Sequence, residues 1–259
     1  MKWEELSALR MADVSRETVC ILPLGAVEQH GRHLPLMTDS LIINEFAVRL
    51  DAVCGGRLLV MPGPRVGCSE HHMAFTGTLT LTHETFRCVV LETLAAAVRH
   101  GFRRFLLLNG HGGNSSIAGV VLEQAAARWP EVEVVSTAWF RVAAERLRPL
   151  VDGDYPAVGH ACELETSVVL ALRPDLVDMA VAKDDGIPAA SPMMRGDLLT
   201  GGAASRAVPM ERITKTGAWG KPSLATAEKG RKILDITVGA LKELLVSCWP
   251  DAPGVEGST

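Results

Sequence analysis

The segment EQHGRHLPLMTD, residues 28–39, carries four side chains of the types that bind metal ions: Glu28, His30, His33 and Asp39. Glu28 and His30 are two residues apart, so in extended chain they point to the same side. Asp39 stands at the expected start of a helix and could approach the same point. His33 is expected to bond loop backbone or line the pocket instead. Because the segment follows the apolar run VCILPLG, a strand would deliver these side chains to one edge of a sheet.

Two further segments place polar side chains in comparable positions. NGHGGN (109–114) follows an apolar run, and its His111 lies in a glycine-rich turn where small neighbours let the backbone approach a ligand. GHACELET (159–166) opens a helix. Ligands of open parallel sheets gather at the carboxyl ends of the strands. Two histidines with several carboxylates suit Zn²⁺ or Mn²⁺, and we expect Asp39 to bridge two such ions about 3.5–4 Å apart.

Short apolar runs alternate with longer helical patterns along the chain. Near-continuous apolar strands separated by helices indicate an α/β fold, a parallel sheet covered on both faces. Strands are expected at 18–25, 57–63, 77–82, 103–110 and 132–140, and helices at 39–54, 83–101, 114–129, 163–177 and about 224–245. The tract 183–223 is rich in Gly, Pro, Ala and Ser. It is expected to form long loops, a lid or an oligomer contact, within a single domain spanning 1–259.

Composition narrows the class of protein. With 259 residues, 47% of them hydrophobic, the chain can bury a sizeable core. A net charge of −4 gives no broad electrostatic reason to bind nucleic acid or an anionic membrane. The start MKWEELSALRM indicates an amphipathic helix rather than a signal peptide. Six scattered cysteines without a CxxC pair favour free thiols, so we expect a soluble protein of the reducing cytoplasm.

Three segments resemble the signature motifs of the creatininase family, the creatinine amidohydrolase-like metal hydrolases. They are LPLGAVEQHGRHLPLMTD, LLLNGHGGN and HACELETSVVLALRPDLV. The resemblance continues in SEHHMAFTGTLTL and GAWGKPSLATAEKG, so it covers most of the chain in the expected order. It implies a three-layer α/β/α sandwich with a mainly parallel central sheet. It also implies a pair of divalent metal ions that serve the hydrolysis of C–N amide bonds.

The resemblance implies a set of metal ligands with one departure. By motif, the family ligands match Glu28, His30, Asp39 and His111. Creatinine-hydrolysing members carry a glutamate two residues after the histidine of the NGH motif, and it binds the second metal. Here that position is Gly113, as in the many members that share the NGHGGN form. Our hypothesis is that Glu163 supplies the missing carboxylate.

Roles for five more residues follow from the same resemblance. His160 matches a substrate-side histidine that could protonate the leaving nitrogen as a general acid or base. Glu165 matches the acid of the ETS motif and could orient a ligand histidine. His72 sits where the family has another substrate-side histidine, although Thr76 replaces the proline of the following turn. Two aromatic residues are candidates for the substrate pocket: Tyr155 and Trp219.

Plainer alternatives exist for several of these residues. His30, taken alone, could be a surface or capping histidine. Glu163 and Glu165 lie near a helix start, where a carboxylate favours the helix dipole without any ligand. His72 could hold a loop. Trp139, at the end of a strand, could wall the pocket like Trp219 or pack in the core. Cys162 invites interpretation as a nucleophile, but metal-activated water needs none.

Three functions compete at this stage. The leading prediction is a metal-dependent amidohydrolase for a cyclic or N-formyl amide, using metal-activated water. The alternatives are a peptidase that trims a small modified peptide of the mycofactocin type, and a metal-binding scaffold without catalysis. Creatinine itself is not expected, because creatinine hydrolases of the family carry a pocket tryptophan where DYPAVGHACELET has none. The resemblance further implies a homo-oligomer, a hexamer, and the ligand set would accept Zn²⁺, Mn²⁺ or Fe²⁺.

Overall fold

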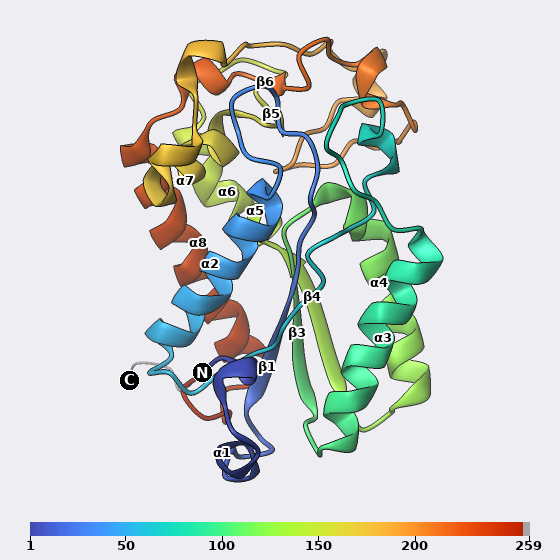
Figure 1. Cartoon of the computed structure of the whole chain (residues 1–259), viewed down its shortest axis with the longest axis vertical. Helices are drawn as coiled ribbons and strands as arrows, with labels where there is room; N and C mark the ends of the chain where they lie inside the picture. Colours follow the sequence, from blue (N-terminus) through green and yellow to red (C-terminus); the bar gives the residue numbers. More distant parts are fainter. Residues whose placement is uncertain (256–259) are drawn as a thin grey trace.

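A four-stranded parallel sheet forms the centre of the computed structural model, which describes residues 1–255 (Figure 1). Its strands lie in the order β2-β1-β3-β4. Their bounds are β1 Val19–Leu24, β2 Leu59–Val60, β3 Arg104–Asn109 and β4 Glu133–Ala138. All six residues of β1 are buried. This explains why its sequence is an uninterrupted apolar run rather than an alternating one.

Helices cover both faces of this sheet and confirm the three-layer α/β/α prediction (Figure 1). Side chains alternate along β1, so Ile21 packs into one core and Leu22 into the other. On the Ile21 side lie α2 Thr38–Val53, α5 Trp139–Val142, α6 Ala144–Leu147, α7 Glu163–Leu172 and α8 Ala227–Cys248; on the Leu22 side lie α3 His83–Arg99 and α4 Ser115–Arg128. The short α1 spans Ala8–Ala12.

Three of the expected strands differ in the structure. The strand expected at 57–63 is reduced to Leu59–Val60. The strand expected at 132–140 ends at Ala138, because the buried Trp139 starts α5 and stacks on Phe46 with ring centroids 5.5 Å apart. The strand expected at 77–82 is wrong, since only a single antiparallel bridge joins Leu79 to Val27. A threonine side chain holds this segment in place instead: the Thr78 hydroxyl accepts a hydrogen bond of 3.1 Å from the backbone N–H of Gln29.

The tract 183–223 consists mostly of loops and short turns, as expected. It also contains β6, Trp219–Gly220, which pairs antiparallel with β5, Val158–His160. This second sheet was not predicted because two- and three-residue strands are too short to show a hydrophobic period. It matters for function because β5 carries His160.

The strand order creates a crevice at one edge of the sheet. From β1 the chain passes through α2 to β2 on one side, and β3 then lies on the other side of β1. Loops leaving the carboxyl ends of β1 and β3 therefore diverge, which is where open α/β sheets bind ligands. Within residues 1–255 no helix is long and apolar enough to cross a membrane, and the six cysteines are free thiols.

The packing of α8 against α7 yields a prediction. A Cβ on Gly230 would lie 1.9 Å from the backbone oxygen of Ser167 in α7, whereas a Cβ on Gly239 of the same helix meets nothing within 4 Å. We expect Gly230→Ala to lower the free energy of unfolding by about 1–3 kcal/mol through overpacking. Gly239→Ala should raise it by up to about 1 kcal/mol through helix propensity. Urea unfolding of both variants tests this, and equal effects would contradict it.

Candidate metal centre

Side chains from separate elements meet at the carboxyl ends of β1 and β3. Glu28 and His30 follow β1, His111 follows β3, and Asp39 lies in the first turn of α2. His160 ends β5 and Glu165 lies in the first turn of α7. Between these two elements Ala161 adopts a left-handed φ of 46°. This sharp bend turns the chain from strand into helix and brings His160 and Glu165 to the same cluster.

Asp39 is the central carboxylate of the cluster. Its Oδ1 lies 3.1 Å from His30 Nε2, and its Oδ2 lies 3.1 Å from His111 Nδ1. On the other side of His111, Glu28 Oε2 lies 3.2 Å from the ring Nε2. Asp39 therefore presents one oxygen to each of two histidines, and it would be the shared carboxylate if two metal ions were bound here.

The cluster divides into two groups that could each hold an ion. In each group the potential ligand atoms lie within 4.8 Å of one another. One group is Glu28, Asp39 and His111, and the other is His30, His160 and Glu165. His30 Nε2 lies 4.0 Å from Glu165 Oε1, and Asp39 reaches both groups. A third combination of Glu28, His72 and His160 also meets the distance criterion.

Burial without hydrogen bonding shows that the cluster fits metal ions. Glu28 is fully buried and Asp39 is 2% exposed. Both oxygens of Glu28 and Oδ2 of Asp39 lack a hydrogen-bond partner, although histidine nitrogens stand within 3.3 Å of each. Buried carboxylate oxygens are costly unless a cation or a donor compensates them. Nitrogen and oxygen atoms that converge in this way without bonding one another are a suitable donor set for a divalent ion.

The electrostatics of the cluster follow from its carboxylates. Burial acts to lower the pKa of His30, but Asp39 more than offsets this and raises the pKa to about 10. Burial also opposes the charge on His111, yet Glu28 and Asp39 raise its pKa to about 9. Burial dominates at His160 and holds its pKa well below the usual range. His160 is therefore a neutral base at physiological pH, while the rings of His30 and His111 compensate the carboxylates.

Glu165, and not Glu163, lies in this cluster. Glu165 Oε2 accepts a bond of 3.3 Å from the backbone N–H of Cys162, which leaves Oε1 toward His30. Glu163 is equally buried, but it is ion-paired with Lys229 of α8 and accepts from the backbone N–H groups of Asp152 and Gly153. Two residues apart on a helix, the side chains diverge by about 200°. This geometry does not support Glu163 as the missing ligand.

The other histidines near the cluster, His33, His71 and His72, have distinct surroundings. His72 is 2% exposed, and its Nε2 lies 3.3 Å from Glu28 Oε1, so it belongs to the cluster. His33 Nε2 bonds to the hydroxyl of Thr166 at 2.9 Å, away from the carboxylates. His71 stacks on the ring of His111 with centroids 5.7 Å apart. Cys162 is a buried residue at the start of α7, and burial raises the pKa of its thiol, which makes it a poor nucleophile.

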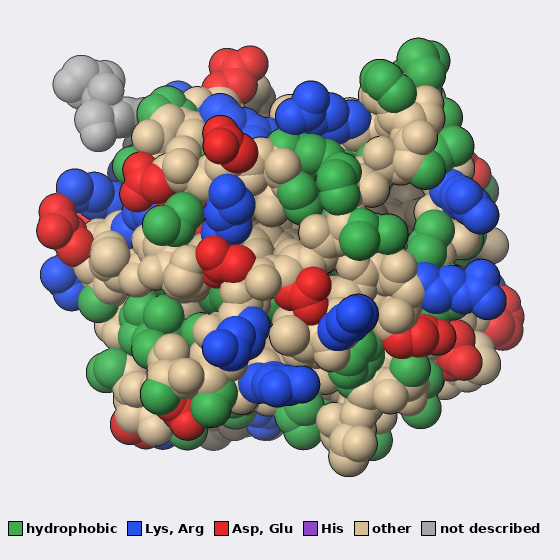
Figure 2. Space-filling view, turned by 90° about the horizontal axis from the view of Figure 1, so that it is seen from above, with side chains coloured by type: hydrophobic (Ala, Val, Ile, Leu, Met, Phe, Trp, Pro, Cys, Tyr) green, Lys and Arg blue, Asp and Glu red, His purple; other side chains and the backbone are tan. Residues whose placement is uncertain are grey.

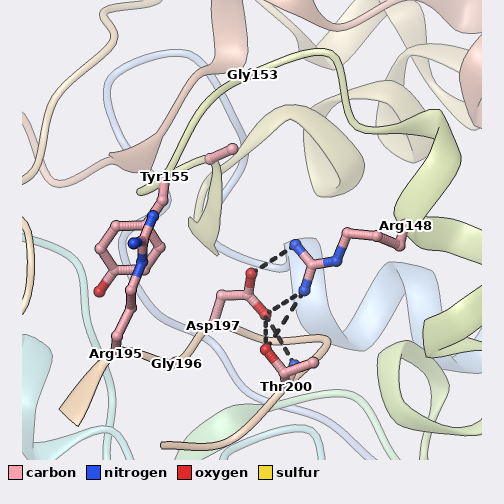
Figure 3. Close-up of a pocket in the computed structure, with 8 residues that line it drawn as sticks. Arg148, Gly153, Tyr155, Arg195, Gly196, Asp197 and Thr200 are labelled. Atoms are coloured by element: carbon pink, nitrogen blue, oxygen red, sulfur yellow. Dashed lines mark hydrogen bonds and ion pairs between the residues drawn. The ribbon is translucent and has the colours of Figure 1, made fainter. Parts of the chain in front are cut away.

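The two aromatic candidates line two different cavities. Tyr155 lines a cavity of about 260 Å³, where the guanidinium of Arg195 lies 4.5 Å from its ring centroid and Arg148 pairs with Asp197 (Figure 3). Trp219 lines another cavity of about 560 Å³, and its indole N–H donates to the backbone oxygen of Ile187 at 3.1 Å. Neither cavity is lined by a member of the two metal groups. A direct role of either ring in substrate binding stays a prediction.

Comparison with known proteins decides the family. The family model for creatininase, described as creatinine amidohydrolase, matches residues 1–245. The chain belongs to the creatininase family. The chain is 30% identical to a creatinine amidohydrolase of Pseudomonas putida over 96% of each chain. It is 31% identical to a mycofactocin precursor peptide peptidase of Mycobacterium ulcerans over 82% of this chain and 78% of the relative.

Solved creatininase structures agree with this membership. A mutant in a Zn-Zn form has a TM-score of 0.79 at 27% identity, and a manganese form has 0.78 at 28%; each covers 96% of this chain and 98% of its own. This creatininase-family chain is a metal-dependent hydrolase of C–N amide bonds. The recognition from motifs is thereby confirmed.

Gly113, where the resemblance places a glutamate in creatinine hydrolases, has no room for a side chain. A Cβ there would lie 2.2 Å from the backbone oxygen of Cys68 and 2.5 Å from His111 Nε2. The neighbouring Gly112 has nothing within 4 Å. The contacts at Gly113 therefore favour glycine at this position, whereas the first turn of α7 carries a buried carboxylate at Glu165.

Gln29 is the site residue that sequence reasoning missed. It stands between two expected ligands in EQHG, and its side chain is 4% exposed. Its amide nitrogen lies 2.8 Å from His72 Nδ1 and 3.2 Å from the backbone oxygen of Gly217. Its place between two expected ligands was the signal in the sequence. Its partners are 43 and 188 residues away, however, so no local sequence pattern could identify them.

The space at Gly113 predicts a contrast between neighbouring glycines. Gly113→Ala must displace the Cys68 carbonyl or the His111 ring, so we expect a zinc content well below that of the wild type. Gly112→Ala should keep the zinc content and change stability by less than about 0.5 kcal/mol. Elemental analysis and thermal unfolding of both variants test this. Full zinc in Gly113→Ala would show that the contacts are not restrictive.

The raised pKa values predict the pH dependence of metal binding. With pKa values raised to about 10 and about 9, His30 and His111 are protonated at neutral pH before a metal binds. A metal must displace these protons, so binding releases them and affinity rises with pH. If both protons leave, the apparent zinc affinity should rise up to about a hundredfold per pH unit between about pH 7 and pH 8. Below pH 7 the rise should be steeper, because burial raises the pKa of Glu28 to about 7 and this ligand must then lose a proton too. Competition titrations against a chelator of known affinity measure this, and a flat profile would contradict it.

Proposed function

We propose that this chain hydrolyses a cyclic or N-formyl amide at a centre of two divalent metal ions. The observation that carries the proposal is the set of three buried carboxylate oxygens, on Glu28 and Asp39, that face histidine nitrogens without hydrogen bonds. Such a set is costly in a protein that has no cation to place there. Family membership supplies the reaction class, and the donor set supplies the place where the reaction occurs.

The proposed ligands divide between two positions. Glu28, Asp39 and His111 would hold one ion; His30, Asp39 and Glu165 would hold the other. Glu165 takes the role that we first gave to Glu163, because only Glu165 points into the cluster. When bound, the metal ions activate a water molecule and polarise the scissile carbonyl. Zn²⁺ and Mn²⁺ both suit the donor set, and Fe²⁺ is a further possibility.

His160 would carry the proton of the reaction. Its Nε2 donates to the backbone oxygen of Gln29 at 2.7 Å, which leaves Nδ1 unprotonated and 3.7 Å from Glu28 Oε1. Because burial lowers its pKa, the ring is a neutral base. A base at this place can accept a proton beside the metal positions and return it to the departing nitrogen. Glu165, as a proposed ligand, would fix the ion beside that base.

The absence of a local tryptophan supports a substrate other than creatinine. The residues before His160 are DYPAVG, and the ring of Tyr155 lies under Arg195 rather than over the cluster. All members of the two metal groups are at most 9% exposed. A small amide fits such a closed site better than a folded protein does. In the view onto this end of the molecule, Lys and Arg side chains lie interspersed with Asp and Glu (Figure 2).

A peptidase is the second candidate, and one observation favours it. Relatives at 29–31% identity include mycofactocin precursor peptide peptidases from several mycobacteria. A flexible end of a short peptide could reach a buried cluster where a protein loop could not. A scaffold without catalysis is disfavoured, because all the proposed ligands and His160 are present. A homo-hexamer and a cytoplasmic location stay predictions.

One set of variants tests the proposed centre. Elemental analysis of zinc-loaded wild type should give two zinc ions per chain. Glu165→Gln should lose about one of them, while Glu163→Gln, the same change two residues earlier, should keep both. The reason is that Glu163 only bonds Lys229 and backbone N–H groups. Loss of zinc from Glu163→Gln instead would return the ligand role to that residue.

A substrate panel then tests the activity with the same proteins. Wild type should hydrolyse cyclic amides or formamides, and Glu165→Gln should lose at least about a hundredfold in kcat/KM, as expected when a group essential to a metal centre is removed. Glu163→Gln serves as the control. Turnover of short peptides alone would select the peptidase. A wild type that binds zinc but hydrolyses none of these substrates would leave the metal-binding scaffold.

A further inference from the structure

Three of the four histidines in the cluster share one arrangement. Each places one ring nitrogen against a backbone carbonyl and turns the other toward a carboxylate of the cluster. In His111 the nitrogen at the carbonyl, Nε2, also lies 3.2 Å from Glu28 Oε2, while Nδ1 faces Asp39. A carbonyl only accepts, so the anchored nitrogen carries the proton in a neutral ring and the inward nitrogen keeps its lone pair. Metal-binding histidines are held in this way. The contacts are His30 Nδ1 to Glu28 O at 3.1 Å, His111 Nε2 to Cys68 O at 3.2 Å, and His160 Nε2 to Gln29 O at 2.7 Å.

His72 is the exception among the four. Its outward nitrogen, Nδ1, faces the side-chain nitrogen of Gln29 at 2.8 Å. An amide NH₂ group only donates, so here the ring nitrogen must accept and cannot carry a proton. The proton of neutral His72 is then on Nε2, which is the nitrogen that faces Glu28 Oε1 at 3.3 Å. The inward atom of His72 is a donor, whereas the inward atoms of the other three rings are lone pairs.

Backbone groups fix the orientation of the Gln29 amide. The N–H of Gly31 donates to Gln29 Oε1 at 3.0 Å, and the oxygen of Gly217 accepts from Nε2 at 3.2 Å. Rotating the amide by 180° would set N–H against N–H and oxygen against oxygen. The two amide hydrogens are also fully used, one by His72 and one by Gly217. The 3.3 Å approach of the amide nitrogen to His160 Nε2 is therefore a contact between two donors.

We propose that Gln29 is a positioning residue that holds His72 as its Nε2–H tautomer, which makes His72 a hydrogen-bond donor beside Glu28 and excludes it as a metal ligand. The inference rests on the metal centre of the proposed function. It rejects the combination of Glu28, His72 and His160 that distance alone allows. Both oxygens of Glu28 lie against ring nitrogens: Oε1 is 3.3 Å from His72 Nε2, and Oε2 is 3.2 Å from His111 Nε2.

The segment around Gly217 is built to hold this amide in place. Gly217 has a φ of +86°, and a Cβ there would lie 2.1 Å from Gln29 Oε1. Its N–H donates to the Thr214 hydroxyl at 3.1 Å. Asp185 in turn accepts from that hydroxyl and from the N–H groups of the next two residues, each at 2.8 Å. The turn 214–217 thus presents one carbonyl to Gln29 and leaves no room for an alternative amide position.

Zinc content distinguishes a donor from a ligand. In His72→Gln the amide nitrogen can replace the Nε2–H donor but not a metal-binding lone pair. We expect His72→Gln to keep the zinc content of the wild type, while His111→Gln, the same change at a proposed ligand, loses at least about half of it. Equal loss from both variants would overturn the inference. The wild type is measured in the same experiment. If the proposed metal centre is wrong, the wild type itself will hold no zinc, and this outcome is distinct from an error in the role of His72.

The tautomer can be observed directly in zinc-loaded protein labelled with ¹⁵N-histidine. Long-range ¹H–¹⁵N correlations should show the His72 proton on Nε2 in wild type; a proton on Nδ1 would overturn the inference. In Gln29→Glu the carboxylate has no N–H, so the His72 proton should move to Nδ1. Gln124→Glu adds the same charge at an exposed site and should leave His72 unchanged. An unchanged tautomer in Gln29→Glu would show that Gln29 does not set it.

A second variant tests the same role of Gln29 even if Gln29→Glu does not fold. Gly217→Ala leaves Gln29 in the sequence but displaces its amide, so the single His72 tautomer should be lost. Gly56→Ala is the matched control, because Gly56 also has a positive φ, +69°, but its Cβ would meet nothing within 4 Å. It carries the same backbone strain and should keep the tautomer. The same spectrum in both variants would contradict a role for the Gly217 contact.

Discussion

The burial of two carboxylates at the switch point of the sheet is the constraint on which the rest of this site depends. Glu28 and Asp39 leave water completely, which costs several kcal/mol per ion unless nearby charge compensates it. Four imidazole rings surround them, and burial alone would keep those rings neutral. Only His30 and His111, the two that contact Asp39, have raised pKa values. A divalent ion can replace those two protons and bond the same atoms.

The close packing around the buried carboxylates also limits which further glutamate can lie at the proposed metal centre. Gly113 is closed by the Cys68 carbonyl and the His111 ring. In the proposed centre the carboxylate comes instead from the first turn of α7, which faces His30. Glu163 is used there by Lys229, so the helix and its loop are tied to α8. Glu165 is held by the Cys162 N–H and turned to the cluster. In the proposed centre Glu163 fixes the helix and Glu165 binds the metal ion.

The sequence predicted the parts of this arrangement that depend on local pattern. The apolar run 19–24, the helical periods and the motif EQHGRHLPLMTD were enough to predict the sheet, its layers and the elements that carry Glu28, His30, Asp39 and His111. It could not predict the direction of a side chain near a helix start, and this is why Glu163 was chosen over Glu165. The β5–β6 sheet and the contacts of Gln29 were also out of reach, since they join residues far apart in the chain.

Buried histidines differ in function through the partner of the nitrogen that faces away from the site. His30 and His160 face carbonyls, so their inward lone pairs can bind a cation or accept a proton. His72 is as deeply buried and as close to Glu28, but its outward partner is an amide N–H. Distance and burial alone would treat the three rings alike. In a cluster this closely packed, the hydrogen-bond polarity of the surrounding backbone and of one glutamine decides which rings can be ligands, because a neutral ring has one lone pair and one proton to distribute.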